Sequence, residues 1–120
     1  MRVSRAIPLS AHAAIEMVAA PALMAGPFLL GFGEAAAAVV AFVIGAVLLG
    51  LALQTSGPGR TVPLSAHAGF DYLLAALAVI SGLVIGGSTG EWAQGIFLVG
   101  IGIAQAALTA ATRFSAPAGA

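Results

Sequence analysis

The sequence predicts an all-α membrane protein whose four transmembrane helices form an up-down bundle. Of its 120 residues, 61% are hydrophobic and 7% are charged, whereas ordinary soluble domains carry roughly 25% charged residues. The apolar residues gather in four stretches, each close to the ~20 residues that a helix needs to cross a bilayer. The connectors between these stretches are short and rich in glycine, so neighbouring helices should run antiparallel.

The four spans are expected at residues 9–30, 35–53, 64–85 and 92–112. The first span contains His12 and Glu16, the third contains His67 and Asp71, and the other two carry no charge. The connectors between them, residues 31–34, 55–60 and 86–91, are expected to be turns because glycine, proline, serine and threonine recur in them.

Composition also excludes several classes of function. The chain has no cysteine, which excludes a disulfide scaffold and a thiolate metal site. Four arginines without lysine, at zero net charge, make no basic patch for nucleic acid. The expected partners are the lipid bilayer and other membrane proteins, either further copies of this chain or a larger complex.

The arginines predict the orientation in the membrane. All of them fall on one side of a four-span arrangement: Arg2, Arg5, Arg60 and Arg113. Glu34 and Glu91 lie in the two loops of the other side. Because positive residues are retained inside, we expect a bacterial inner-membrane protein with both termini in the cytoplasm.

An internal repeat relates the two halves of the chain. Residues 5–16 and 60–71 match, 55 positions apart, and the segment Pro-Leu-Ser-Ala-His-Ala is identical in both. This pattern predicts tandem duplication of a two-helix unit, with repeats at 1–57 and 58–120. Because each unit crosses the membrane twice, the copies should be related by a pseudo-two-fold axis along the membrane normal.

The first unit resembles the SPW-repeat membrane proteins, whose repeat is a pair of transmembrane helices with a Ser-Pro-Trp motif in the first. The matching segment is Gly-Pro-Phe-Leu-Leu-Gly-Phe at residues 26–32, with glycine in place of serine and phenylalanine in place of tryptophan. The second copy has Ser-Gly-Leu at 81–83 and no proline. The resemblance implies a helical hairpin and no particular activity.

Two His-x-x-x-acid pairs are the candidate site. His12 and Glu16 are four residues apart, as are His67 and Asp71, so each pair lies on one helix face. Small residues continue both faces, and small residues mark helix contacts in membranes. Both pairs should therefore point into the bundle, at one depth, with Gln105 of the fourth span at about the same level.

Three functional hypotheses follow from these residues. In the first, His12 and His67 are the axial ligands of a b-type haem in an electron-transfer protein, and Arg5 and Arg60 meet its propionates. In the second, both histidines and both acids bind a divalent transition metal. In the third, the acids carry protons or cations along a path through the membrane.

A structural role competes with these three hypotheses. Each histidine can bond the acid of its own helix, or Ser10 and Ser65 can act as N-caps that leave the histidines in the headgroup zone. Among these four hypotheses, we expect a non-enzymatic subunit or scaffold with a pseudo-symmetric His/carboxylate site near the cytoplasmic side.

Overall fold

The computed structural model describes residues 5–56 and 62–114. In chain order, the elements are β1 (Ile7–Pro8), α1 (Leu9–Leu29), α2 (Ala35–Ser56), α3 (Leu64–Thr89), α4 (Trp92–Ala110) and β2 (Thr112–Arg113). Each of the four helices is long and apolar enough to cross a membrane, which confirms the predicted all-helical architecture with four spans.

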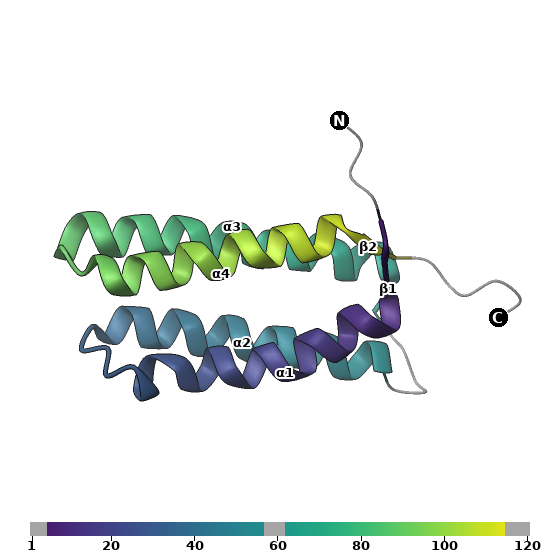
Figure 1. Cartoon of the computed structure of the whole chain (residues 1–120), viewed down its shortest axis with the longest axis horizontal. Coiled ribbons are helices and arrows are strands. Elements are labelled where there is room, and N and C mark those ends of the chain that lie inside the picture. The colour runs from purple at the N-terminus through teal and green to yellow at the C-terminus, as the bar shows by residue number, and fades with distance from the viewer. Residues whose placement is uncertain (1–4, 57–61, 115–120) are drawn as a thin grey trace, which may run out of the picture.

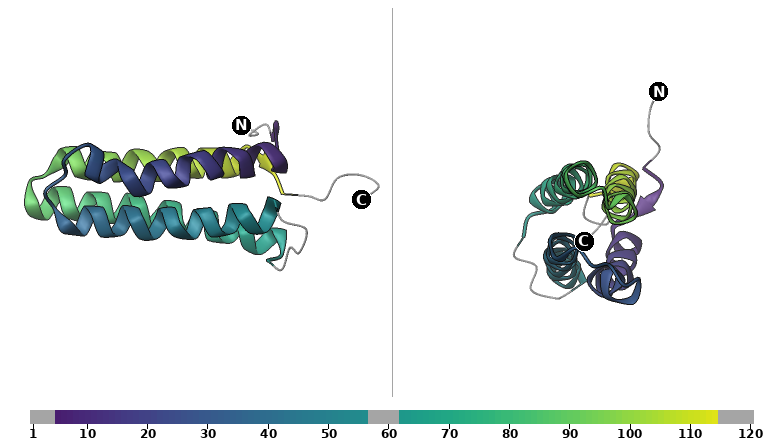
Figure 2. Two further views of the ribbon diagram at one scale, coloured as in Figure 1. Left: turned by 90° about the horizontal axis from the view of Figure 1, so that it is seen from below. Right: turned by 90° about the vertical axis from the view of Figure 1, so that its left-hand side faces the viewer.

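The helices form two antiparallel hairpins that pack side by side. One layer holds α1 and α2 and the other holds α3 and α4 (Figure 1). Seen along the bundle, α1 and α3 occupy opposite corners of a square (Figure 2). The loops within the two hairpins lie at one end of the bundle, and β1 and β2 lie at the other, which we call the strand end.

Small residues bring the helices of each hairpin close together. A Cβ atom on Gly95 of α4 would lie 2.6 Å from the carbonyl oxygen of Gly82 on α3, and one on Gly102 would also meet α3 backbone. In the other hairpin, a Cβ atom on Gly45 would lie 2.8 Å from the carbonyl oxygen of Ala20. This close approach is the packing mode of small residues in membrane helices.

Proline sets the start of both helices that carry the site. Pro8 and Pro63 are the N-caps of α1 and α3, and neither cap makes a side-chain hydrogen bond. The alternative with Ser10 and Ser65 as N-caps is wrong, because both serines are already helical. The φ angles of Pro8 and Pro63, −70° and −59°, are the values that the proline ring fixes, and they lead directly into the helix.

The helix ends differ slightly from the expected boundaries. The third helix continues through the predicted turn to Thr89 and stops at Gly90, whose φ is +76°. The hydroxyls of Ser88 and Thr89 donate to carbonyls one turn earlier, which keeps these polar side chains satisfied within the helix. The second helix runs to Ser56 and the fourth ends at Ala110.

A short parallel pairing joins the first and last described segments. Ile7 pairs with Thr112 and Pro8 with Arg113, and the Ile7 N–H donates to the carbonyl of Ala111 at 3.0 Å. The pairing was not predicted, because two-residue strands have no periodicity to detect. It holds the segment after α4 against the first turn of α1.

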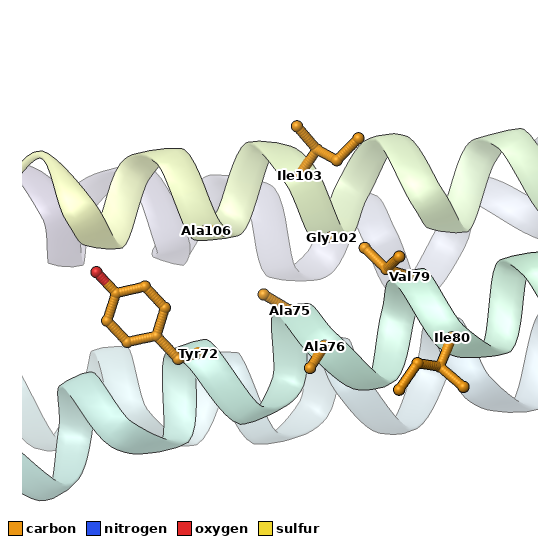
Figure 3. Close-up of a pocket in the computed structure, with 8 residues that line it drawn as sticks. All are labelled: Tyr72, Ala75, Ala76, Val79, Ile80, Gly102, Ile103 and Ala106. Atoms are coloured by element: carbon orange, nitrogen blue, oxygen red, sulfur yellow. The ribbon is translucent and has the colours of Figure 1, made fainter. Parts of the chain in front are cut away.

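The outer surface of the bundle is apolar, as expected for contact with lipid. Large hydrophobic side chains such as Val18, Leu29, Val39 and Ile96 are exposed. A shallow groove runs between α3 and α4 on this surface (Figure 3). Apart from Tyr72 its lining is aliphatic or glycine: Ala75, Ala76, Val79, Ile80, Gly102, Ile103 and Ala106. Such a surface suits acyl chains.

Candidate metal centre

Four ionisable side chains meet inside the bundle near the strand end. His12 and Glu16 come from α1, and His67 and Asp71 come from α3. None is more than 1% exposed. Because α1 and α3 are diagonal in the bundle (Figure 2), their inward faces meet near its axis. We call these four residues the His/carboxylate cluster.

Each histidine approaches both acids, one on its own helix and one on the other. His12 Nε2 lies 3.1 Å from Glu16 Oε1 and 3.0 Å from Asp71 Oδ2. His67 Nε2 lies 3.3 Å from Glu16 Oε1 and 3.1 Å from Asp71 Oδ2. The result is a closed ring in which nitrogen and oxygen atoms alternate. One ligand atom from each of the four residues lies within 4.8 Å of the other three.

Two threonines determine which nitrogen of each histidine carries a proton. Thr112 Oγ1 lies 2.8 Å from His12 Nδ1, and Thr55 Oγ1 lies 2.9 Å from His67 Nδ1. Each hydroxyl donates its only proton to the carbonyl four residues earlier. The threonine oxygen must therefore accept from an Nδ1–H. Nε2 of both rings is left to face the centre of the cluster.

The two carboxylates differ in how their second oxygen is held. Gln105 of α4 donates its Nε2–H to Glu16 Oε2 at 3.1 Å. Asp71 Oδ1 is buried and has no hydrogen-bond partner among the described residues. Among the described residues, Thr109 Oγ1 is the other buried side-chain oxygen or nitrogen that has no hydrogen-bond partner. The site is thus asymmetric although its histidines are held alike.

Phe114 covers the cluster from the strand end. Its ring centroid lies 5.0 Å from that of His12 and 5.5 Å from that of His67. The half-buried ring is held close by the pairing of β2 with β1. The histidines are therefore separated from the surroundings by an aromatic ring on that side.

The structure brings together most of the residues predicted for the site. His12, His67, both acids and Gln105 belong to one network of contacts. Arg5 is exposed, and no contact joins it to the histidines among the interactions of the described residues. Arg60 lies outside the described residues, so its expected role with haem propionates stays a prediction.

Sequence reasoning missed Thr55, Thr112 and Phe114. The two threonines lie where the second and fourth helices return to the strand end, at the level of the histidines. The signal was the sequence Leu-x-x-x-Thr in both places, residues 51–55 and 108–112. In an up-down bundle, that position is opposite the first turns of the other helices.

Because the cluster is buried, the charges of its two acids must be balanced by positive charges within it. A charged side chain at the centre of a transmembrane helix costs about 2.5–3.5 kcal/mol on insertion scales. Glu16 and Asp71 each lie about 10 Å along their helices, given a rise of 1.5 Å per residue. Two carboxylates at this depth need two positive charges close by, either on the imidazoles or on a bound cation.

The four N···O separations around the ring are close to the ligand spacing of a small metal ion. In a tetrahedral site with bonds of about 2.0 Å, ligand atoms lie about 3.3 Å apart. The four N···O distances are 3.0–3.3 Å. The imidazole protons also point away from the centre, to hydroxyl oxygens, which is the usual arrangement around metal-bound histidine.

Comparison of the chain with protein-family models, curated proteins and solved structures finds no match.

Proposed function

We propose that this chain is a small, non-enzymatic integral membrane protein that binds one divalent transition-metal ion in the His/carboxylate cluster. The ion would link α1 of one hairpin to α3 of the other, so the protein would act as a metal-holding subunit or scaffold. Two neutral imidazoles and two carboxylates around a divalent cation have zero net charge, which suits a buried site. Nitrogen and oxygen ligands of this kind suit zinc, iron or manganese.

One observation carries this proposal: both Nε2 atoms make short contacts to the same two oxygens. Without a metal, the two Nε2–H groups of two imidazolium rings would have to serve four N···O contacts of 3.0–3.3 Å. A hydrogen bond prefers an angle above 150°, so each proton serves one of its two oxygens well. A central cation would satisfy all four atoms at once.

The matching threonines support a pseudo-symmetric origin for the site. The His67–Thr55 bond joins α3 to α2, and the His12–Thr112 bond joins α1 to the segment after α4. A two-fold exchange of the hairpins would interchange these two bonds. We therefore propose that the chain arose by tandem duplication with an axis along the membrane normal. We also propose that its first hairpin is related to the SPW-repeat proteins.

The haem alternative fits these residues less well. Two axial histidines require a flat macrocycle between their rings. Oxygens of Glu16 and Asp71 lie within 3.3 Å of both Nε2 atoms, in the space where the ring nitrogens of a haem would be. Binding haem would require both carboxylates to leave.

The transport alternative lacks a polar route towards the loop end. Beyond the cluster, the described core is formed by aliphatic side chains: Ala20, Leu23, Ala41, Ile44, Leu74, Ala78, Ile85 and Leu98. The next buried polar side chain on α4 is Gln94, which accepts from the N–H of Glu34 in the loop between α1 and α2. An ion leaving the cluster in that direction would lose its polar ligands.

We further propose that the chain lies in a bacterial inner membrane with the strand end towards the cytoplasm. The support comes from the positions of the arginines and the positive-inside rule. The apolar outer surface would contact lipid, and further copies of the chain or a larger membrane complex would be its protein partners.

The proposal is tested by the metal content and metal-dependent stability of the full-length protein in detergent. We expect close to one equivalent of a divalent transition metal per chain by mass spectrometry of the elements. Zinc added to the metal-free protein should raise its melting temperature. A ligand at 100 times its Kd stabilises the folded state by about 2.7 kcal/mol.

His12→Gln and His67→Gln should each abolish the bound metal and the zinc-dependent rise in melting temperature. Gln94→Leu is the matched control, because it replaces a buried polar side chain at the far end of α4; it should keep both. Wild-type protein that takes up no metal and melts alike with and without zinc would show that the cluster is a structural ion network.

A further inference from the structure

We propose, building on the metal site above, that Asp71 gives both of its carboxylate oxygens to the ion and Glu16 gives one. The site would then be five-coordinate, with two imidazoles, one monodentate and one bidentate carboxylate. This makes Asp71 the residue that determines which ions the site prefers, because its second oxygen sets the coordination number.

The hydrogen bonds around the two acids carry this inference. Glu16 Oε2 is engaged by Gln105, which turns that oxygen away from the ion and favours coordination through Oε1 alone. Asp71 Oδ2 is already at 3.0 and 3.1 Å from the two Nε2 atoms. Asp71 Oδ1, on the same carboxyl group, is buried with no partner among the described residues.

A buried acceptor without a partner destabilises the folded state, and more so when it is charged. Asp71 is fully buried, so solvent does not supply the missing interaction. Coordination of Oδ1 to the same cation removes this cost without moving the backbone, because a carboxylate binds hard and borderline cations through one or both oxygens. Asp71 Oδ1 is thus available as a second ligand atom for the ion.

Thr109 is the rival partner for this oxygen. The close approaches of Gly95 to Gly82 and of Gly102 to Ala75 set an antiparallel register for α3 and α4. In that register Thr109 is level with residue 68, one turn before Asp71 on α3. If its hydroxyl donated to Oδ1, Asp71 would coordinate through one oxygen and the site would be four-coordinate.

Cobalt distinguishes the two arrangements, because tetrahedral Co²⁺ absorbs visible light several-fold more strongly than five-coordinate Co²⁺. The experiment loads full-length, metal-free protein with Co²⁺ in detergent and records absorbance per bound ion. We expect the weaker, five-coordinate spectrum for the wild type. Asp71→Asn keeps one oxygen ligand and replaces the other atom by an amide nitrogen, so its absorbance per bound ion should rise several-fold.

Glu16→Gln is the matched control. It removes the same charge from an acid that already coordinates through one oxygen, and the Gln105 amide can turn its oxygen towards the new NH₂ group. Its affinity for Co²⁺ should fall while the absorbance per bound ion stays at the wild-type level. Thr109→Val should likewise leave the spectrum unchanged.

An intense tetrahedral spectrum in the wild type would overturn the five-coordinate assignment. So would equal spectral changes in Asp71→Asn and Glu16→Gln, or a spectrum that changes in Thr109→Val. If Asp71→Asn binds no cobalt, the absorbance per bound ion of the wild type by itself distinguishes five-coordinate from tetrahedral cobalt. A wild-type protein that binds neither cobalt nor zinc would contradict the metal site itself, which is a separate outcome.

Discussion

Thr112 and His12 are 100 residues apart in the sequence, and Thr112 Oγ1 lies 2.8 Å from His12 Nδ1. The Thr112 hydroxyl donates its proton to the carbonyl of Leu108, so its oxygen accepts a hydrogen bond from the Nδ1–H of the ring. Thr55 does the same for His67. The histidines of α1 and α3 are therefore oriented from outside those helices, by the end of α2 and by the strand that follows α4.

Removing either hydroxyl should weaken metal binding. Thr112→Val and Thr55→Val keep the side-chain shape but leave an Nδ1–H without an acceptor, so each ring loses its fixed orientation. Outer partners of metal-bound histidines are typically worth about 10- to 100-fold in affinity. We expect losses of that size for zinc, measured by competition with a chelator of known affinity.

Thr112→Ser and Thr55→Ser restore the hydroxyl and are the matched controls, with affinity near that of the wild type. If the valine variants bind zinc as tightly as the serine variants, the threonines do not position the rings.

Substitution of Gly95 should separate α3 from α4. A Cβ atom there would lie 2.6 Å from the carbonyl oxygen of Gly82, so Gly95→Ala forces the backbones apart. Overpacking of this kind costs about 1–3 kcal/mol. Unfolding in dodecyl sulfate, followed by the fluorescence of Trp92, the single tryptophan, should show a loss of that order.

Gly100→Ala is the control on the same helix, because a Cβ atom at Gly100 meets nothing within 4 Å. It should be neutral, or stabilising by up to about 1 kcal/mol since alanine favours helix. Equal destabilisation by the two variants would show that the close approach of α3 and α4 does not limit stability.

Phe114 should slow the exchange of the bound metal. Its ring lies against both imidazoles on the strand end, so Phe114→Ala opens the site there without removing a ligand. We expect release of zinc to an excess of chelator to become several-fold faster, measured by stopped flow. Phe28→Ala, which removes an exposed ring in the last turn of α1, should release zinc at the wild-type rate.

The orientation in the membrane is testable because the chain has no cysteine. Arg5 lies at the strand end and Glu91 in the loop between α3 and α4, and both are exposed. In intact bacterial cells, an impermeant maleimide should label Glu91→Cys, whereas Arg5→Cys should react only after lysis. The reverse labelling pattern would place the strand end outside.

The sequence alone predicted the four spans, their antiparallel order and the inward direction of both His-x-x-x-acid pairs. These features depend on composition and helical periodicity, which are local: an apolar stretch of about 20 residues has few alternatives to a membrane helix. The identical segments around His12 and His67 also indicated that the two histidines lie at one depth. Gln105 was found in the same way, from its level in the bundle.

Only the tertiary structure decided how these groups meet. Whether His12 bonds Glu16 alone or Asp71 as well depends on the diagonal placement of α1 and α3, which periodicity does not specify. Thr55, Thr112 and Phe114 join the site through contacts between segments far apart in the chain. The unequal treatment of Glu16 and Asp71 likewise comes from one side chain on a third helix, Gln105, because hydrogen bonds depend on three-dimensional distances that a repeat in sequence leaves open.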